Sequence, residues 1–135
     1  MREQKRSLAA GLPILRALII HHEDDPVCWN IEDQYYFGGD FLVAPIMNDE
    51  GVRDVYLPSG EWVDFWTGTV LKGGVWFRSV RCSIEKMPVY VRKNASVPFC
   101  VDDVQCTDEI DFSKLKTVKF DGRFKEIGRI LKFIK

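Results

Sequence analysis

Short apolar segments that alternate with turn residues dominate this chain from about residue 41 onward. Glycine, proline, serine and aspartate cluster between the segments, where they favour tight turns. Several short strands at such spacing are typical of a β-sandwich or a barrel. We therefore predict a mainly β fold with an antiparallel β-sandwich. The expected strands are residues 41–46, 55–57, 61–66, 75–77, 88–92, 118–120 and 129–134, of which the last also fits a helical face, and residues 102–111 are expected to form a loop.

The beginning of the chain follows a different pattern. Leu12 to Ile20 is a nearly continuous apolar run, which suits a strand buried on both faces, as in a parallel sheet. Asp25 followed by Pro26 is typical of a helix start, with Asp25 as N-cap, and this helix should extend to Tyr36. We therefore predict two parts, a short β/α piece at residues 1–39 and the sandwich at residues 40–135.

Composition and charge exclude several classes of function. With 19 basic and 20 acidic residues the net charge is -1, so no global field attracts nucleic acid or an anionic membrane. The longest apolar run contains Arg16 and is shorter than the roughly 20 residues that span a bilayer. The first residues lead to no signal-peptide core, and the cysteines form no C-x-x-C pair. We therefore expect reduced thiols at Cys28, Cys82, Cys100 and Cys106, no metal, no cofactor, no nucleic-acid or membrane partner, and a cytoplasmic location.

Three segments, in order, resemble the end of the α-glycosidases of glycoside hydrolase family 31. The first holds G-L-P, R-A-L, D-D-P, D-Q-Y and L-V-A-P between Gly11 and Pro45. The second is Y-L-P-S-G-E-W-V-D-F-W-T-G, which begins at Tyr56, and the third is M-P-V-Y-V-R with A-S-V-P, which ends at Pro98. The resemblance covers residues 11 to about 99. It implies the last strand and helix of a catalytic (β/α)8 barrel, followed by the β-sandwich domain behind it.

Within the family, two features resemble the α-xylosidase branch. Ala17 stands where the family's α-glucosidases usually have proline, and the run from Asp24 to Cys28 is similar to that of the α-xylosidases. The segment His21-His22-Glu23 departs from the family pattern, which has an acidic residue followed by Phe-Pro at this place. The rim of the expected sugar pocket therefore differs from that of the family.

We predict no catalytic residue in this chain. A retaining glycosidase needs two carboxyl groups about 5 Å apart, one as nucleophile and one as acid/base. The resemblance implies that both are aspartates on earlier barrel strands, and the nucleophile motif W-x-D-M-[NS]-E does not occur in this sequence. Asp64 follows Trp62 in a similar order, but the residues after it belong to the sandwich motif. We therefore interpret Asp64 as a strand or turn residue.

Asp24 and Asp25 are the candidate substrate-binding residues. They follow the predicted barrel strand at its C-terminal end, where barrel enzymes place their chemistry. The alternative is that Asp25 caps a helix and Asp24 is a solvated loop carboxylate. Adjacent side chains also diverge, which does not suit a shared acid/base role.

Three other groups have both a structural and a functional interpretation. Arg16 must be paired if it is buried, and Asp33 on the predicted helix is its expected partner. Neighbouring His21 and His22 point to opposite faces of an extended chain, which does not suit a metal site. Aromatic side chains could stack on a sugar, although alternate strand positions favour the core. These aromatic residues are Tyr35, Tyr36, Trp62, Trp66, Trp76 and Phe77.

The sequence therefore predicts the C-terminal part of an α-xylosidase-like family 31 glycosidase, inactive alone because the catalytic carboxylates are missing. Two alternatives stay open: a carbohydrate-binding or interaction module, and a structural remnant. A split enzyme would need an upstream chain with the catalytic barrel as its partner. An apolar strand without barrel neighbours also favours a homodimer formed through the N-terminal segment. The side chains expected at that contact are Ile14, Leu15, Leu18, Ile19 and Ile20.

Overall fold

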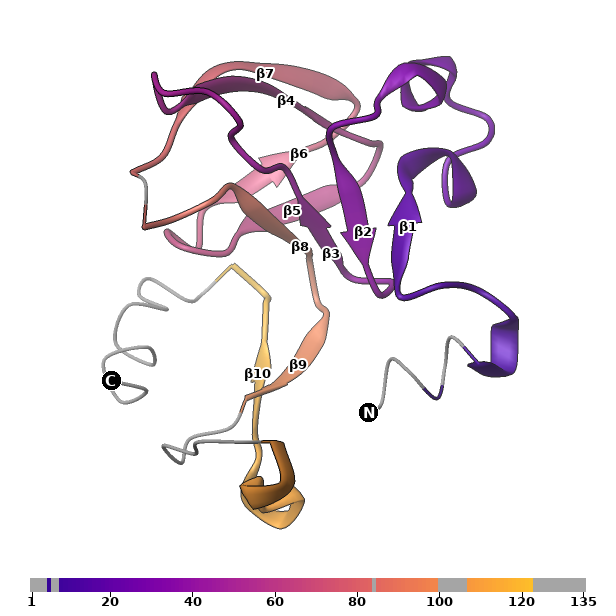
Figure 1. Ribbon diagram of the computed structural model, residues 1–135, viewed down its shortest axis with the longest axis vertical. Helices are drawn as coiled ribbons and strands as arrows, with labels where there is room; N and C mark the ends of the chain where they lie inside the picture. The colour runs from indigo at the N-terminus through magenta and orange to yellow at the C-terminus, as the bar shows by residue number, and fades with distance from the viewer. Residues whose placement is uncertain (1–4, 6–7, 84, 100–106, 123–135) are drawn as a thin grey trace.

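The computed structural model describes residue 5 and residues 8–83, 85–99 and 107–122 of the chain. In this part, ten strands form one six-stranded sheet and two ribbons of two strands each (Figure 1). Every strand pairing is antiparallel. The predicted mainly β, antiparallel fold is confirmed.

The six-stranded sheet, called the central sheet below, joins segments that lie far apart in the sequence. Its strand order is β1-β2-β3-β8-β5-β6. Because β3 pairs with β8, the M-P-V-Y-V-R motif lies beside the L-V-A-P motif. The strands are β1 (Leu15–Ala17), β2 (Tyr35–Phe37), β3 (Phe41–Val43), β8 (Val89–Arg92), β5 (Glu61–Asp64) and β6 (Val70–Lys72).

Each face of the central sheet is covered by one two-stranded ribbon (Figure 1). One ribbon pairs β4 (Val52–Leu57) with β7 (Val75–Arg81), and the other pairs β9 (Ser96–Phe99) with β10 (Lys116–Lys119). Residues 8–10 are helical, and four short 3₁₀-helices complete the described elements. They are η1 (Leu18–Ile20), η2 (Pro26–Asn30), η3 (Thr107–Glu109) and η4 (Phe112–Lys114).

Side-chain alternation along the central strands builds two separate cores. Trp62 on β5 and Tyr90 on β8 point toward the β4–β7 ribbon and belong to the first core. Their neighbours Val63 and Val91 point to the opposite face and belong to the second core, under the β9–β10 ribbon. This two-sided burial follows from the period of two along a strand. The burial expected for Tyr56, Leu57, Trp62 and Val91 is confirmed, and Val89 is half-buried.

A glycine makes the close turn beside Trp62 possible. Gly73 N–H donates to the carbonyl oxygen of Gly60 at 2.7 Å. A Cβ atom at position 73 would lie 1.8 Å from the carbonyl oxygen of Pro58. Since that oxygen also accepts the indole N–H of Trp62, no larger residue fits without moving the core.

The long buried strand predicted for residues 12–20 is wrong. The strand β1 has only three residues and forms an edge of the central sheet, antiparallel to β2. Within it Arg16 is buried and Leu15 is 58% exposed. The chain then turns into η1, which buries Leu18. The apolar run is therefore split between an exposed strand face and a short helix.

The helix predicted for residues 26–36 is also wrong beyond its first turn. The 3₁₀-helix η2 ends at Asn30, and residues 35–37 form β2. Asp33 does not pair with Arg16, because its carboxylate pairs with Arg53 at 2.7 Å. The strand expected at 41–46 ends at Val43, and β6 was not predicted. Residues 129–134 lie outside the described residues.

The division of the chain at residue 39 stays a prediction. On both sides of this position the chain contributes strands to the central sheet, since β2 pairs with β3. Tyr36 from β2 and Leu42 from β3 pack in the same core.

Candidate functional site

Asp24 and Asp25 lie immediately before η2. The Asp24 side chain is exposed. Asp25 accepts the backbone N–H of Val27 at 3.1 Å through Oδ1, and the Tyr56 hydroxyl at 2.6 Å through Oδ2. The predicted cap is therefore confirmed for η2, and the same carboxylate ties η2 to β4. A role of either aspartate in substrate binding stays a prediction.

The hydrogen bond from Tyr56 lowers the pKa of Asp25, which keeps this carboxylate ionised. Burial raises the pKa of the nearby Cys28 thiol to about 12, and the Asp25 charge adds to this effect. A thiol with so high a pKa is protonated at neutral pH and is not a nucleophile. Cys28 therefore contacts Asp25 as a protonated thiol at neutral pH.

Two histidines, a tyrosine and two arginines form a polar group beside the first core. We call His21, His22, Tyr36, Arg16 and Arg92 the histidine cluster. His21 lies 3.1 Å from an Arg16 nitrogen, and His22 lies 2.7 Å from the Tyr36 hydroxyl. Arg92 donates to the same hydroxyl at 3.2 Å.

Arg16 determines the role of one imidazole. A guanidinium can only donate, so Nε2 of His21 must accept from Arg16, and His21 is neutral in this arrangement. The Tyr36 hydroxyl accepts from Arg92 and also shares a hydrogen bond with Nε2 of His22. Burial lowers the pKa of both histidines. The charges of Arg16 and Arg92 lower the pKa of His21 further. The charge of Arg92 also lowers the pKa of His22, and Asp25 partly opposes this shift.

We expect the chain to lose stability as the pH falls below about 6.5. The unfolded histidines titrate near 6.5 and the folded ones at lower pH, so the unfolded state binds more protons in that window. The loss per histidine stays below about 1.4 kcal/mol per pH unit, and solvent screening reduces it further. Urea unfolding at pH 7.5, 6.0 and 5.0 measures it. The matched variant H21N/H22Q should have a flatter profile above pH 5; an unchanged slope contradicts the assignment.

The three tryptophans among the aromatic residues singled out in the sequence do not form the sugar-stacking platform that was the alternative to a place in the core. Trp62 is 1% exposed and donates its indole N–H to Pro58 at 2.8 Å, so it is a core residue. Trp66 is half-buried, and Trp76 packs against Tyr56 and Arg78 on the β4–β7 ribbon. These three indoles therefore offer no common face to a sugar.

Two residues that organise this region were not singled out in the sequence. Arg92 lies over the rings of Tyr36 and Trp62, 5.5 Å and 5.3 Å from their centroids. Gln34 is buried and its side-chain amide bonds both the N–H and the carbonyl oxygen of Tyr56, each at 2.8 Å. Both act on partners more than 20 residues away, which local patterns do not reveal.

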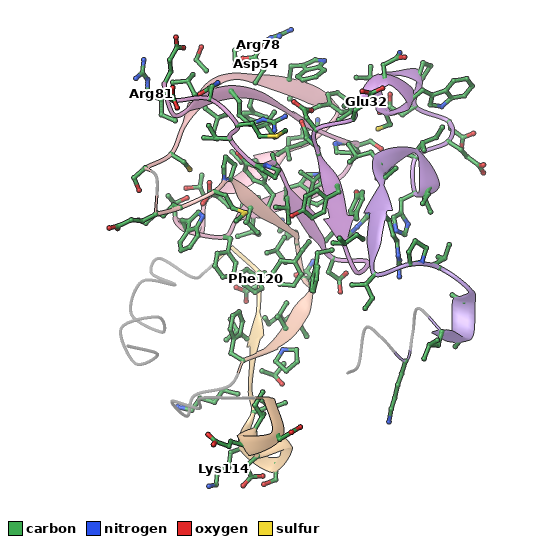
Figure 2. All side chains as sticks on the ribbon, viewed as in Figure 1. Glu32, Asp54, Arg78, Arg81, Lys114 and Phe120 are labelled. Carbon is green, nitrogen blue, oxygen red and sulfur yellow. The ribbon has the colours of Figure 1, made fainter. Side chains whose placement is uncertain are left out.

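An apolar groove of about 450 Å³ runs between β1, η1, η2 and the start of β2. We call it the β1 groove. Its walls include Leu15, Ile19 and Trp29, and Trp29 is 61% exposed. Glu32, labelled in Figure 2, marks its position near η2. Because β1 is an edge of the central sheet, its outer backbone groups are not paired with another strand of the described residues.

The described residues contain no group of three His, Cys, Asp or Glu side chains that could hold a metal ion. None of the helices among them is long and apolar enough to cross a membrane. Of the four cysteines, Cys28 and Cys82 lie in the described part and are free thiols.

Comparisons with known proteins match this chain to one family of glycosidases. A sequence profile described as the glycosyl hydrolase family 31 C-terminal domain matches residues 11–97. "Alpha-glucosidase 2" of Bacillus thermoamyloliquefaciens is 34% identical over 101 residues, which cover 74% of this chain and 12% of that protein. An α-xylosidase of Saccharolobus solfataricus is 35% identical over 73% of this chain and 14% of its own length.

Solved structures agree with these sequence matches. A family 31 α-xylosidase from a soil metagenome, crystallised with xylose, is 38% identical and superposes with a TM-score of 0.66. The match covers 70% of this chain and 14% of that structure. The chain spans only between 9% and 16% of the length of the curated relatives that it matches.

Proposed function

The chain belongs to glycosyl hydrolase family 31, of which it carries the C-terminal domain, and we propose that it supports an α-glycosidase without performing the chemistry itself. The observation that carries this proposal is the missing nucleophile motif in a chain that spans so little of its relatives. Ala17 and the run from Asp24 to Cys28 favour an α-xylosidase as the whole enzyme. The free thiols of Cys28 and Cys82 are compatible with the cytoplasm, where we place it.

The isolated chain should not hydrolyse an aryl α-D-xyloside or α-D-glucoside. Without a nucleophile and an acid/base about 5 Å apart it cannot form and resolve a glycosyl intermediate. Release of the chromogenic phenol by the purified chain measures this. Turnover that survives repurification and disappears in D24N would contradict the proposal and make Asp24 catalytic.

We propose that the catalytic part of the enzyme docks on the β1 groove. Apolar side chains gather there, and an exposed apolar patch beside an open strand edge is typical of an interaction surface. The relatives named as an α-glucosidase and an α-xylosidase are several times longer than this chain, which leaves room for a catalytic part outside the matched segment. The catalytic barrel would thus cover Leu15, Ile19 and Trp29.

Without that barrel, the same groove should join two copies of the chain. Covering an exposed apolar side chain fully stabilises the contact by roughly 1.5–3 kcal/mol. We expect light scattering after size exclusion, at tens of micromolar protein, to give twice the 15.6 kDa of one chain. The variant L15D should be monomeric, because it places a charge in the contact. Leu18 is fully buried within its own chain and is not a suitable probe.

The matched control is V75D. Val75 is exposed on β7 and does not line the groove, so this variant should dimerise like the parent. A monomeric parent at tens of micromolar, or a dimer that L15D leaves intact, would contradict the homodimer.

A further inference from the structure

A second cleft lies away from the β1 groove and shares no lining residue with it. It has a volume of about 290 Å³, and its walls come from the ends of β5 and β7, the start of β8 and the turns beside them. We call it the Trp66 cleft. Arg81, which lines it, and Glu32, which lines the β1 groove, lie on opposite sides of the view in Figure 2. This volume is at the lower end of the range for small-molecule pockets, so one sugar ring fits and an oligosaccharide does not.

Tyr90 supplies a phenol hydroxyl to this cleft. The residue is 3% exposed, and its ring packs in the first core. Within the described part of the chain, its hydroxyl has no hydrogen-bond partner. The described residues hold no fully buried side-chain oxygen without a partner, so this hydroxyl reaches solvent, and Tyr90 lines the cleft. Burial first, and then the charges of Asp64 and Cys82, raise the pKa of the hydroxyl to about 12, so it stays protonated and can both donate to a ligand and accept from one.

Asp64 and Trp66 form a rigid frame next to that hydroxyl. Oδ1 of Asp64 accepts the backbone N–H groups of Trp66 at 2.8 Å and Thr67 at 2.9 Å. The indole N–H of Trp66 donates to the carbonyl oxygen of Met87 at 2.7 Å, and its ring meets Phe65 edge-on at 5.1 Å. Oδ2 of Asp64 makes no hydrogen bond within the described residues. The frame therefore places an aromatic ring and a free carboxylate oxygen at fixed positions in one cleft.

The charges of the cleft decide the class of ligand. Lys86 and Arg81 bring positive charge to its walls, and the Lys86 ammonium lies 5.5 Å from the Trp66 ring centroid. Asp64 brings negative charge beside the Tyr90 hydroxyl. An anion would meet Asp64 and a cation would meet Lys86 and Arg81, whereas a neutral polyol can donate to Asp64 and accept from Lys86 and Tyr90.

We propose that the Trp66 cleft binds one neutral monosaccharide unit, with the sugar hydroxyls on Asp64, Tyr90 and Lys86 and a ring face toward Trp66. This site would act as a non-catalytic anchor for carbohydrate, separate from the site that a docked catalytic barrel would supply. Binding by the isolated chain does not require that barrel. The proposal therefore stands or fails independently of the proposed function.

Titration of the ¹⁵N-labelled chain with methyl α-D-glucopyranoside and methyl α-D-xylopyranoside tests the site. The four tryptophans give four indole N–H signals, so Trp66 can be followed directly, with Trp29 in the β1 groove as internal reference. We expect the Trp66 indole and the Thr67 amide to shift with a Kd on the order of 1–10 mM, as for a small neutral ligand. The Trp29 signal should stay in place.

Two variants and one further ligand make the test decisive. Y90F removes only the hydroxyl and should weaken binding about fivefold, as for one lost hydrogen bond. D64N keeps an acceptor for the two turn amides and should weaken binding to a similar degree, which provides the answer if Y90F does not fold. Sodium glucuronate should bind more weakly than the neutral sugars. Absent shifts at 100 mM sugar, equal shifts at Trp29, full affinity in both variants, or tighter binding of glucuronate would each overturn the proposal.

Discussion

Replacing Trp62 with alanine should lower the free energy of unfolding by about 3–5 kcal/mol, as expected for a buried aromatic side chain. Trp62 is 1% exposed, packs against Tyr36 with 6.0 Å between ring centroids, and lies under the Arg92 guanidinium. Its loss leaves a cavity in the first core, and the Pro58 carbonyl loses the indole donor. Urea unfolding followed by circular dichroism at pH 7.5 measures the change.

The matched control for this prediction is W29A, with both tryptophan variants made in the monomeric L15D background. Trp29 is 61% exposed within one chain, so its removal there should cost less than about 1 kcal/mol. A similarly small loss for W62A would place Trp62 at the surface and make it available to a sugar. Equal large losses for both variants would show that the exposed indole of Trp29 is covered in solution.

Replacing Phe120 with alanine should destabilise the chain by a similar amount, about 3–5 kcal/mol. Phe120 is fully buried in the second core and lies 6.1 Å from Phe65 and 6.4 Å from Phe99 between ring centroids. Figure 2 shows it between the central sheet and the β9–β10 ribbon. Its loss would therefore uncouple the ribbon from the second face of the central sheet.

The matched control here is F37A, because Phe37 lies on β2 with 47% of its surface exposed. Its truncation should cost less than about 1 kcal/mol, measured in the same urea melts. A small loss for F120A would contradict the three-layer arrangement, since the second face of the central sheet would then not depend on the ribbon.

The sandwich strands could be predicted from the sequence because local signals there agree with one another. Around Leu57 and Trp62, apolar residues are separated by Pro58-Ser59-Gly60, and the turn confines the strands to the segments on either side. Alternation also predicted which residues are buried, since Trp62 and Val63 each enter a core from opposite faces of one strand.

The first 39 residues could not be predicted in the same way. A short apolar run has no period that separates a two-sided strand from a strand followed by a helix turn. Arg16 and Leu18 are buried while Leu15 and Ile19 are exposed, and this pattern depends on segments far along the chain, since β1 pairs edge to edge with β2. The predicted helix does not extend to Gln34, because the side-chain amide of Gln34 pairs with the backbone of β4. This tertiary contact overrides the local helix propensity.

For the candidate site, the sequence revealed the local cap and not the long-range partners. Asp25 before Pro26 was enough to predict the N-cap. The link from Asp25 to Tyr56, and that from Tyr36 to Arg92, join residues 31 and 56 positions apart. The order of strands in the central sheet brings Tyr36 and Arg92 together, and the packing of the β4–β7 ribbon on that sheet brings Tyr56 to Asp25.

The most direct test of the central claim, that this chain carries no catalytic nucleophile, is its intact mass after incubation with an activated 5-fluoro α-glycosyl fluoride. Such a reagent traps the covalent glycosyl intermediate of a retaining glycosidase. A full-length family 31 α-xylosidase should gain one glycosyl unit under the same conditions, which establishes that the reagent is active. We predict that this chain stays at 15.6 kDa. A single glycosyl adduct that maps to Asp24 or Asp25 and is lost in the corresponding asparagine variant would contradict the account.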